Sequence, residues 1–214
     1  MFKLYDYWRS SAAFRVRIGL NLKGLAYQAM SVNLAADARE HLDPAYRALN
    51  AQARIPMLET ETGARITQSM AILEWLEEAY PEPAFLPRDA ATRAQVRAFA
   101  NVIACDIHPL NNVSVLGRLE AQFGADKNAI GQWYRHWIAE GFTALEASLS
   151  ERAETAFAFG DTPGLADIFL APQCYNARRF KLDFAPFPRI EALDARLQQH
   201  PAFAAAAPEM HKPG

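Results

Sequence analysis

The chain has 214 residues, of which 51% are hydrophobic and 21% charged, so a disordered chain is excluded and a globular protein with an apolar core is expected. Lysine and arginine number 22 against 24 acidic residues, and a formal net charge of −2 provides no overall field for nucleic acid or an anionic membrane. The two cysteines, Cys105 and Cys174, are far apart in the sequence, which argues against a disulfide framework and favours a reducing compartment. We therefore expect a cytoplasmic protein without nucleic-acid or membrane partners, and the spacing of the histidines predicts no metal site.

Short strand-like and helix-like segments alternate over residues 1–81. The predicted elements, in chain order, are a strand at 2–5, a helix at 11–23, a strand at 27–32, a helix at 41–49, a hairpin from 57–59 to 66–67 and a helix at 69–80. Gly24 stands where a C-terminal cap belongs, and Pro81 ends the last helix. This β-α-β-α-β-β-α order predicts a small mixed sheet covered by helices.

The second part of the chain has a different periodicity. The stretch 81–90 contains three prolines and is typical of a linker, and helical periodicity continues from about residue 91 to residue 199 without a convincing strand. We predict a mixed α/β domain at 1–81, a linker at 82–90 and an all-α domain of five or more helices at 91–214.

Arg9, Ser10 and Ser11 lie between the first predicted strand and the first predicted helix. A helix N-terminus presents unpaired N–H groups and a partial positive charge, so it stabilises an anion. A hydroxyl at that place can donate to a thiolate and lower the pKa of the thiol. The spacing alone equally allows a serine that merely caps the helix.

Two further segments are candidates for ligand binding. A cis proline at Ile55-Pro56, just before a strand, would expose the backbone of Ile55 to an extended peptide. Gln68-Ser69, at the start of a helix, would offer N–H groups and a hydroxyl to a carboxylate. An ordinary turn proline and a simple helix cap are the structural alternatives.

Several segments together resemble the zeta class of the cytosolic glutathione transferases, whose signature contains SSCxxRVRIAL. The resembling segments are RSSAAFRVRIGLNLKG (9–24), IP (55–56), QSMAILEWLEE (68–78), CDIHPLNN (105–112), FGDTPGLADIFLAPQ (159–173) and NARRFKLD (176–183). The resemblance runs through most of the chain. It implies an α/β thioredoxin-like domain at 1–81 before the all-α domain, and glutathione as the cofactor.

Residue by residue, the resemblance implies that Ser10 and Ser11 face the sulfur of glutathione, without deciding which of the two is closer. It also implies that the backbone of Ile55 pairs with the cysteinyl part of glutathione. Gln68 and Ser69 would then hold the carboxylate of the γ-glutamyl group.

The resemblance also implies that His41 and Gln52 reach toward the rest of the tripeptide, and that Asp106, His108 and Asn112 line the cleft from the helical domain. His108 and Asn112 are four residues apart, so we expect them to share a helix face. Capping and packing around the neighbouring proline is the alternative for these three residues.

Arg9 and Arg179 are the candidates for binding a dicarboxylate, because guanidinium groups match carboxylates bidentately. Arg178 and Arg179 could also be solvated cations in the last turn of a helix. The resemblance at NARRF favours a functional role for Arg179 only.

The chain departs from the family pattern at three places. The cysteine of the signature is replaced by Ala12, the common NP reads Asn50-Ala51, and the usual Ser or Thr cap before LAD reads Gly164. Glycine loses only about a few tenths of a kcal/mol as an N-cap. Only Ala12 is expected to touch the site.

The resemblance implies a homodimeric, glutathione-dependent cis–trans isomerase that converts a maleyl keto acid, either maleylacetoacetate or maleylpyruvate, in aromatic-compound catabolism. One alternative is a glutathione transferase or dehalogenase that acts on small α-halo acids. Another is a non-catalytic ligand-binding protein, although such a protein would not need Ser10, Ser11, Gln68 and Ser69 together.

Overall fold

The computed structural model describes residues 1–35 and 37–213. The chain forms two compact units by its internal contacts. The first contains Met1–Ala84 and the C-terminal segment from His200, and the second contains Phe85–Gln199. The predicted combination of an α/β thioredoxin-like part and an all-α part is confirmed. The C-terminal segment, which the sequence assigned to the helical domain, instead makes its contacts with the first unit.

The first unit is built on a four-stranded mixed sheet with the order β2-β1-β3-β4. Its strands are β1 (Phe2–Asp6), β2 (Tyr27–Ser31), β3 (Met57–Glu59) and β4 (Arg65–Thr67). β1 pairs parallel with β2 and antiparallel with β3, and β3 pairs antiparallel with β4. Alternate residues of β1 are buried, so one face of this strand contributes to the core.

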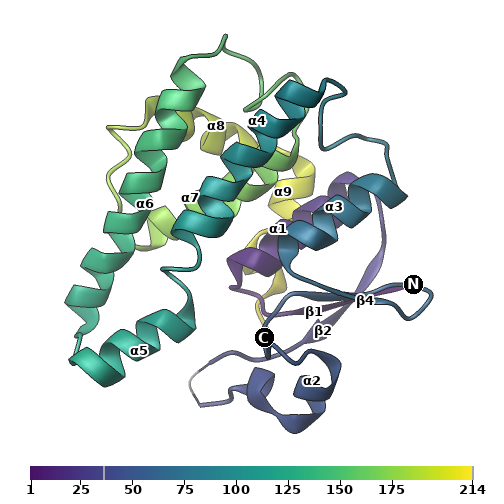
Figure 1. Cartoon of the computed structure of the whole chain (residues 1–214), viewed down its shortest axis with the longest axis vertical. Helices are drawn as coiled ribbons and strands as arrows, with labels where there is room; N and C mark the ends of the chain where they lie inside the picture. The colour runs from purple at the N-terminus through teal and green to yellow at the C-terminus, as the bar shows by residue number, and fades with distance from the viewer. Residues whose placement is uncertain (36, 214) are drawn as a thin grey trace. The chain divides into compact units, whose positions relative to one another are not determined.

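Helices cover both faces of this sheet, with α1 (Ser11–Leu22) and α3 (Ser69–Ala79) on one face and α2 (Pro44–Leu49) on the other (Figure 1). α9 (Pro201–Ala206) packs on α1. This contact explains why the C-terminal segment belongs to the first unit. The segment ends in a short 3₁₀ helix, η3 (Pro208–His211).

The helix predicted at 41–49 is divided in the structure. A 3₁₀ turn, η1 (Glu40–Leu42), comes first, and Asp43 in an extended conformation separates it from α2. The physical reason is Pro44, which lacks an N–H group and is accommodated at the first turn of a helix rather than in its interior.

The second unit is helical and is organised around a buried central helix. Its helices are α4 (Ala90–Asn101), the π-helix η2 (Val102–Ile107), α5 (Val113–Phe123), α6 (Lys127–Ser150), α7 (Leu165–Arg179) and α8 (Pro188–Gln199). α7 is buried around most of its circumference and packs against α4 and α8. Within residues 1–35 and 37–213, no helix combines the length and apolar character needed to cross a membrane.

The N-terminus of α7 depends on Asp167 and Gly164. The buried carboxylate of Asp167 accepts the N–H of Gly164 at 2.9 Å and that of Ala158 at 3.0 Å, while burial raises the pKa of Asp167 to about 6. A Cβ atom on Gly164 would lie 2.7 Å from the carbonyl oxygen of Phe85. The glycine is therefore required by a close backbone approach, and is more than a slightly weaker cap.

Gly164→Ala should lower the free energy of unfolding by about 1–3 kcal/mol, because the added methyl group overlaps a backbone oxygen that cannot move independently. Differential scanning calorimetry measures the effect. Gly117→Ala is the matched control, since a Cβ atom there meets nothing within 4 Å. In the interior of α5 it should raise stability by about 0.5–1 kcal/mol. Equal effects of the two substitutions would contradict the steric explanation.

Candidate functional site

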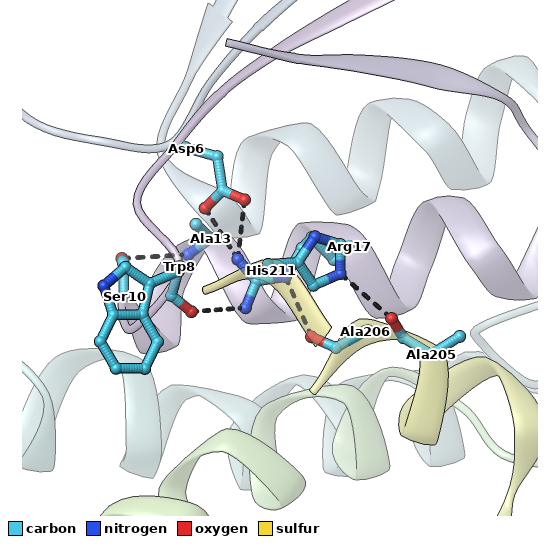
Figure 2. A network of polar contacts seen from close by, with 8 residues as sticks. All are labelled: Asp6, Trp8, Ser10, Ala13, Arg17, Ala205, Ala206 and His211. Carbon is cyan, nitrogen blue, oxygen red and sulfur yellow. Dashed lines mark hydrogen bonds and ion pairs between the residues drawn. The ribbon is translucent and has the colours of Figure 1, made fainter. Parts of the chain in front are cut away.

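The N-terminus of α1 is an anion-binding position. Ser10 is the N-cap, and its Oγ accepts the N–H of Ala13 at 3.3 Å (Figure 2). Ser11 is the first residue of the helix, and the first turn contains no acidic side chain. The positive end of the helix dipole is therefore not neutralised by the helix itself.

The capping role of Ser10 is compatible with a role toward a ligand. A hydroxyl group accepts through its lone pairs and donates through its proton, so the bond from Ala13 leaves the Ser10 proton available. The catalytic role of Ser10 and Ser11 stays a prediction.

The N-terminus of α3 forms a second position of the same kind. Ser69 is buried, and its Oγ accepts a hydrogen bond from Nη1 of Arg15 at 3.2 Å. Gln68, the N-cap, has φ = 69°, a left-handed conformation that is uncommon for a non-glycine residue. Its Nε2 donates to Oε1 of Gln52 at 2.8 Å, so two of the predicted binding residues are in contact. The first turn of α3 also lacks an acidic residue.

The loop before β3 presents an open backbone. The peptide bond Ile55-Pro56 is cis, which is the isomer that the ligand-binding interpretation requires. The carbonyl of Arg54 accepts both the hydroxyl of Tyr46 and Nδ2 of Asn50, each at 2.7 Å, and these bonds fix the loop. Ile55 is half-buried and makes no hydrogen bond to another residue within 1–35 and 37–213. Its N–H and C=O groups can therefore pair with an extended peptide.

His41 lies in the 3₁₀ turn η1 and is half-buried. Burial is the main cause that lowers its pKa, and the positive charges of Arg39 and Arg47 act in the same direction. The lowered pKa favours the neutral imidazole of His41. A neutral imidazole can bind a ligand by hydrogen bonds but adds no permanent charge to the site.

The residues predicted at 105–112 differ from expectation in one respect. His108 follows the π-helix, donating its N–H to the carbonyl of Ile103 at 2.9 Å, whereas Asn112 is the N-cap of α5. The prediction of a shared helix face is wrong, because Pro109 has no N–H group to continue the helix. Asn112 accepts the N–H of Ser114 at 3.0 Å, as the capping interpretation expected.

Asp106 lies in the π-helix and is exposed. Single π-helical turns inside helices occur frequently at functional sites, and the sequence gave no sign of this one. The functional roles of Asp106, His108 and Asn112 remain predictions.

Arg179 and Arg178 end α7 and have different surroundings. Arg178 forms an ion pair with the buried carboxylate of Asp194. Arg179 is exposed, and its guanidinium lies 4.8 Å from the ring centre of Phe180. The ion pair gives Arg178 a structural role, and the binding role of Arg179 stays a prediction.

Arg15 and Arg17 lie within the segment 9–24, and the resemblance implied no role for either residue. They are 2% and 0% exposed, so α1 carries two guanidinium groups into the interior of the first unit. Two arginines within the otherwise apolar stretch FRVRIGL were the signal that could have identified them, because arginine is almost never fully buried unless it is paired.

A cavity of about 290 Å³ in the first unit does not coincide with these groups. It is bordered by β1, β2 and α2, and its charged residues are Glu40 and Asp43. Two carboxylates would repel an anionic ligand. Among the described residues, moreover, no group of three His, Cys, Asp or Glu side chains could hold a metal ion.

The first unit thus presents two helix N-termini and one unpaired peptide group. Together these groups fit a short peptide that carries a carboxylate and an acidic thiol, because each helix N-terminus favours one negative charge. Glutathione is a peptide of that kind, and the residues present fit it.

Comparisons with known proteins agree with this geometry. The family model for the glutathione S-transferase N-terminal domain matches residues 9–79, and that for the C-terminal domain matches residues 131–206. A maleylpyruvate isomerase from Ralstonia sp. is 50% identical over 208 residues, which are 96% of each chain.

Solved structures are similar over the same length. The holo structure of a maleylpyruvate isomerase, described as a bacterial zeta-class glutathione S-transferase, has a TM-score of 0.93 at 48% identity and covers 96% of each chain. A maleylacetoacetate isomerase from Anaeromyxobacter dehalogenans 2CP-1, with dicarboxyethyl glutathione and citrate in its active site, has a TM-score of 0.85 at 42% identity. It covers 98% of this chain and 91% of its own. The chain belongs to the glutathione S-transferase family and, within it, to the zeta class.

Proposed function

We propose that this protein is a glutathione-dependent cis–trans isomerase that converts a maleyl keto acid into its fumaryl isomer in aromatic-compound catabolism. The observation that carries the proposal is the pair of helix N-termini at Ser10 and Ser69, both without an acidic residue in the first turn, beside the open backbone of Ile55. The relatives named as maleylpyruvate and maleylacetoacetate isomerases support it. The enzyme would be a cytoplasmic homodimer, as in the predictions from the sequence.

When bound, glutathione supplies a thiolate that can add reversibly to the double bond conjugated to the ketone, which permits rotation about that bond. The chain's own contribution is to stabilise the thiolate. The N-terminus of α1 favours the negative charge, and the hydroxyl of Ser10 or Ser11 donates a hydrogen bond to it. Ser69, whose Oγ accepts from Arg15, keeps its own proton to donate to a ligand carboxylate.

Arg9 and Arg179 are the candidate anchors for the carboxylates of the substrate. Both are exposed, and each guanidinium lies near an aromatic ring, 5.3 Å from Trp8 and 4.8 Å from Phe180 respectively. An aromatic neighbour restricts the orientation of each guanidinium, and a guanidinium group matches a carboxylate bidentately.

Thiol–disulfide exchange needs a reactive protein thiolate, which neither the cysteine position of the family signature nor Cys174 supplies, and the exposed Cys105 lies in η2 of the helical unit. The family's cysteine position is Ala12, and Cys174 is fully buried, with burial raising its pKa to about 12. Addition to a double bond needs only the thiol of glutathione. The chemistry of the chain therefore favours isomerisation over reductive dehalogenation.

Turnover should consume no glutathione. Maleylpyruvate and maleylacetoacetate are each incubated with the protein and a catalytic amount of glutathione, while the absorbance of the keto acid and the concentration of free thiol are followed together. We expect many turnovers at constant thiol and none without glutathione. An α-halo acid is the control substrate, since displacement of halide would consume one thiol per turnover. Stoichiometric thiol loss with the maleyl acids would instead indicate a transferase.

Ser10→Ala should lower the rate on the order of 10²-fold and raise the pKa of the bound glutathione thiol, because it removes a donor aimed at the thiolate. Ser11→Ala and the double variant test which hydroxyl acts. The substitution also removes a helix cap, which costs about 1 kcal/mol of stability. Asp89→Ala is the control for that effect, since Asp89 caps α4 by accepting from Thr92 at 2.8 Å. Unchanged turnover in all three serine variants would contradict the assignment.

Arg179→Ala should raise the KM for the keto acid about tenfold or more, because the substrate loses roughly one charge-assisted contact to a carboxylate. The affinity for glutathione, measured by calorimetry, should stay near that of the wild type. Arg178→Ala is the matched control, because it breaks the ion pair with Asp194 and should lower thermal stability without changing KM. If the KM for the keto acid in the Arg179→Ala variant equals that of the wild type, Arg179 does not bind the substrate.

A further inference from the structure

Arg17 uses all three of its guanidinium nitrogens within the first unit (Figure 2). Its Nη1 lies 2.8 and 2.7 Å from the two carboxylate oxygens of Asp6, its Nη2 donates to the carbonyl of Trp8 at 3.0 Å, and its Nε donates to the carbonyl of Ala206 at 3.0 Å. Arg17 is 0% exposed and Asp6 4%. One guanidinium thus joins the end of β1, the turn after it and the end of α9.

The contact with Trp8 bears directly on the site. Residues 7–10 form a turn closed by the hydrogen bond from the N–H of Ser10 to the carbonyl of Tyr7 at 2.8 Å. Trp8 and Arg9 are the central residues of this turn, and its last residue, Ser10, caps α1. A donor fixed on the Trp8 carbonyl therefore restrains the peptide plane that leads into Arg9 and Ser10.

The C-terminal segment completes this restraint. Ala206, whose carbonyl binds Arg17, is the last residue of α9, and the neighbouring carbonyl of Ala205 lies 3.0 Å from Nε2 of His211. Lys212 has its Nζ 5.8 Å from the ring centre of Trp8. The C-terminal segment is thus connected to the turn in two ways. Arg17 binds both the carbonyl of Ala206 and the carbonyl of Trp8, and Lys212 lies over the ring of Trp8.

A purely structural ion pair would not need this arrangement. Charges are costly to bury, and the carboxylate of Asp6 alone compensates the charge of Arg17. The remaining donors could have bonded anywhere in the core, yet one of them is placed on the turn that ends in Ser10 and another on the C-terminal segment. A rigid support behind a site is what holds a hydroxyl at the distance a thiolate requires.

We propose that Arg17 is a positioning residue of the glutathione site, which clamps the turn at residues 7–10 against the C-terminal segment and so fixes Ser10 and Arg9. The inference rests on the proposed binding of glutathione at Ser10. It does not depend on which keto acid is the substrate.

The test compares the full-length protein with its Arg17→Lys variant, in which one ammonium group cannot reach Asp6, Trp8 and Ala206 together. The main readout is the pKa of bound glutathione, from the ultraviolet absorbance of the thiolate against pH. Asn21→Ala is the matched control. Asn21 also lies in α1 and also binds the C-terminal segment, through the carbonyl of Ala202 at 3.0 Å, but it does not contact the turn.

We expect Arg17→Lys to raise the measured pKa of the bound thiol by about one and to lower kcat about tenfold, corresponding to about 1.4 kcal/mol. Asn21→Ala should lose thermal stability while its thiol pKa stays at the wild-type value. If the thiol pKa of Arg17→Lys equals that of the wild type, the clamp is merely structural and the proposal is overturned.

Asp6→Glu is the second variant in case Arg17→Lys does not fold, because it keeps both charges and displaces the guanidinium by one methylene group. It should also raise the thiol pKa, and an unchanged value would overturn the proposal equally. Because the main readout needs no turnover, a wild-type protein that lowers the thiol pKa but does not isomerise would contradict the proposed function and leave this inference standing.

Discussion

Helix α1 carries two buried guanidinium groups, and the hydrogen bonds of Arg17 join several of the elements around this helix. Arg15 and Arg17 are 2% and 0% exposed. A buried charge is tolerated only when it is paired and hydrogen-bonded. Arg17 therefore draws the end of β1 and the end of α9 onto α1, and Arg15 connects α1 with the start of α3 through Ser69.

This arrangement has a consequence for the site, because both candidate anion positions lie where an arginine of α1 makes contact. Ser10 is the last residue of the turn that Arg17 restrains, and Ser69 accepts a hydrogen bond from Arg15. Neither α1 nor α3 has an acidic residue in its first turn, so the positive ends of both helix dipoles remain available to a ligand. The charges that stabilise the fold thus also support an anionic peptide.

The helical unit contains two local irregularities, an interrupted helix around Pro109 and a close backbone approach at Gly164. The π-helix η2 ends just before Pro109, and α5 starts anew at Asn112, so the chain changes direction between Asp106 and Asn112. Side chains that a continuous helix would align therefore occupy different local environments. The glycine at 164 is a comparable case, since the carbonyl of Phe85 approaches too closely for any side chain.

The sequence by itself determined the order of elements, the change from mixed α/β to helical periodicity, and the helix starts at Ser11 and Ser69, because these features depend on periodicity and on capping residues next to them in the chain. Only the tertiary structure decided that the C-terminal segment belongs with the first unit, that Arg17 faces Asp6, and that Ser69 receives a bond from Arg15. Arg17 and Asp6 are 11 residues apart and Arg15 and Ser69 are 54 apart, while the C-terminal segment lies at the other end of the chain. Local periodicity contains no information about such contacts. The partner of a buried charge is fixed by the packing of the whole unit.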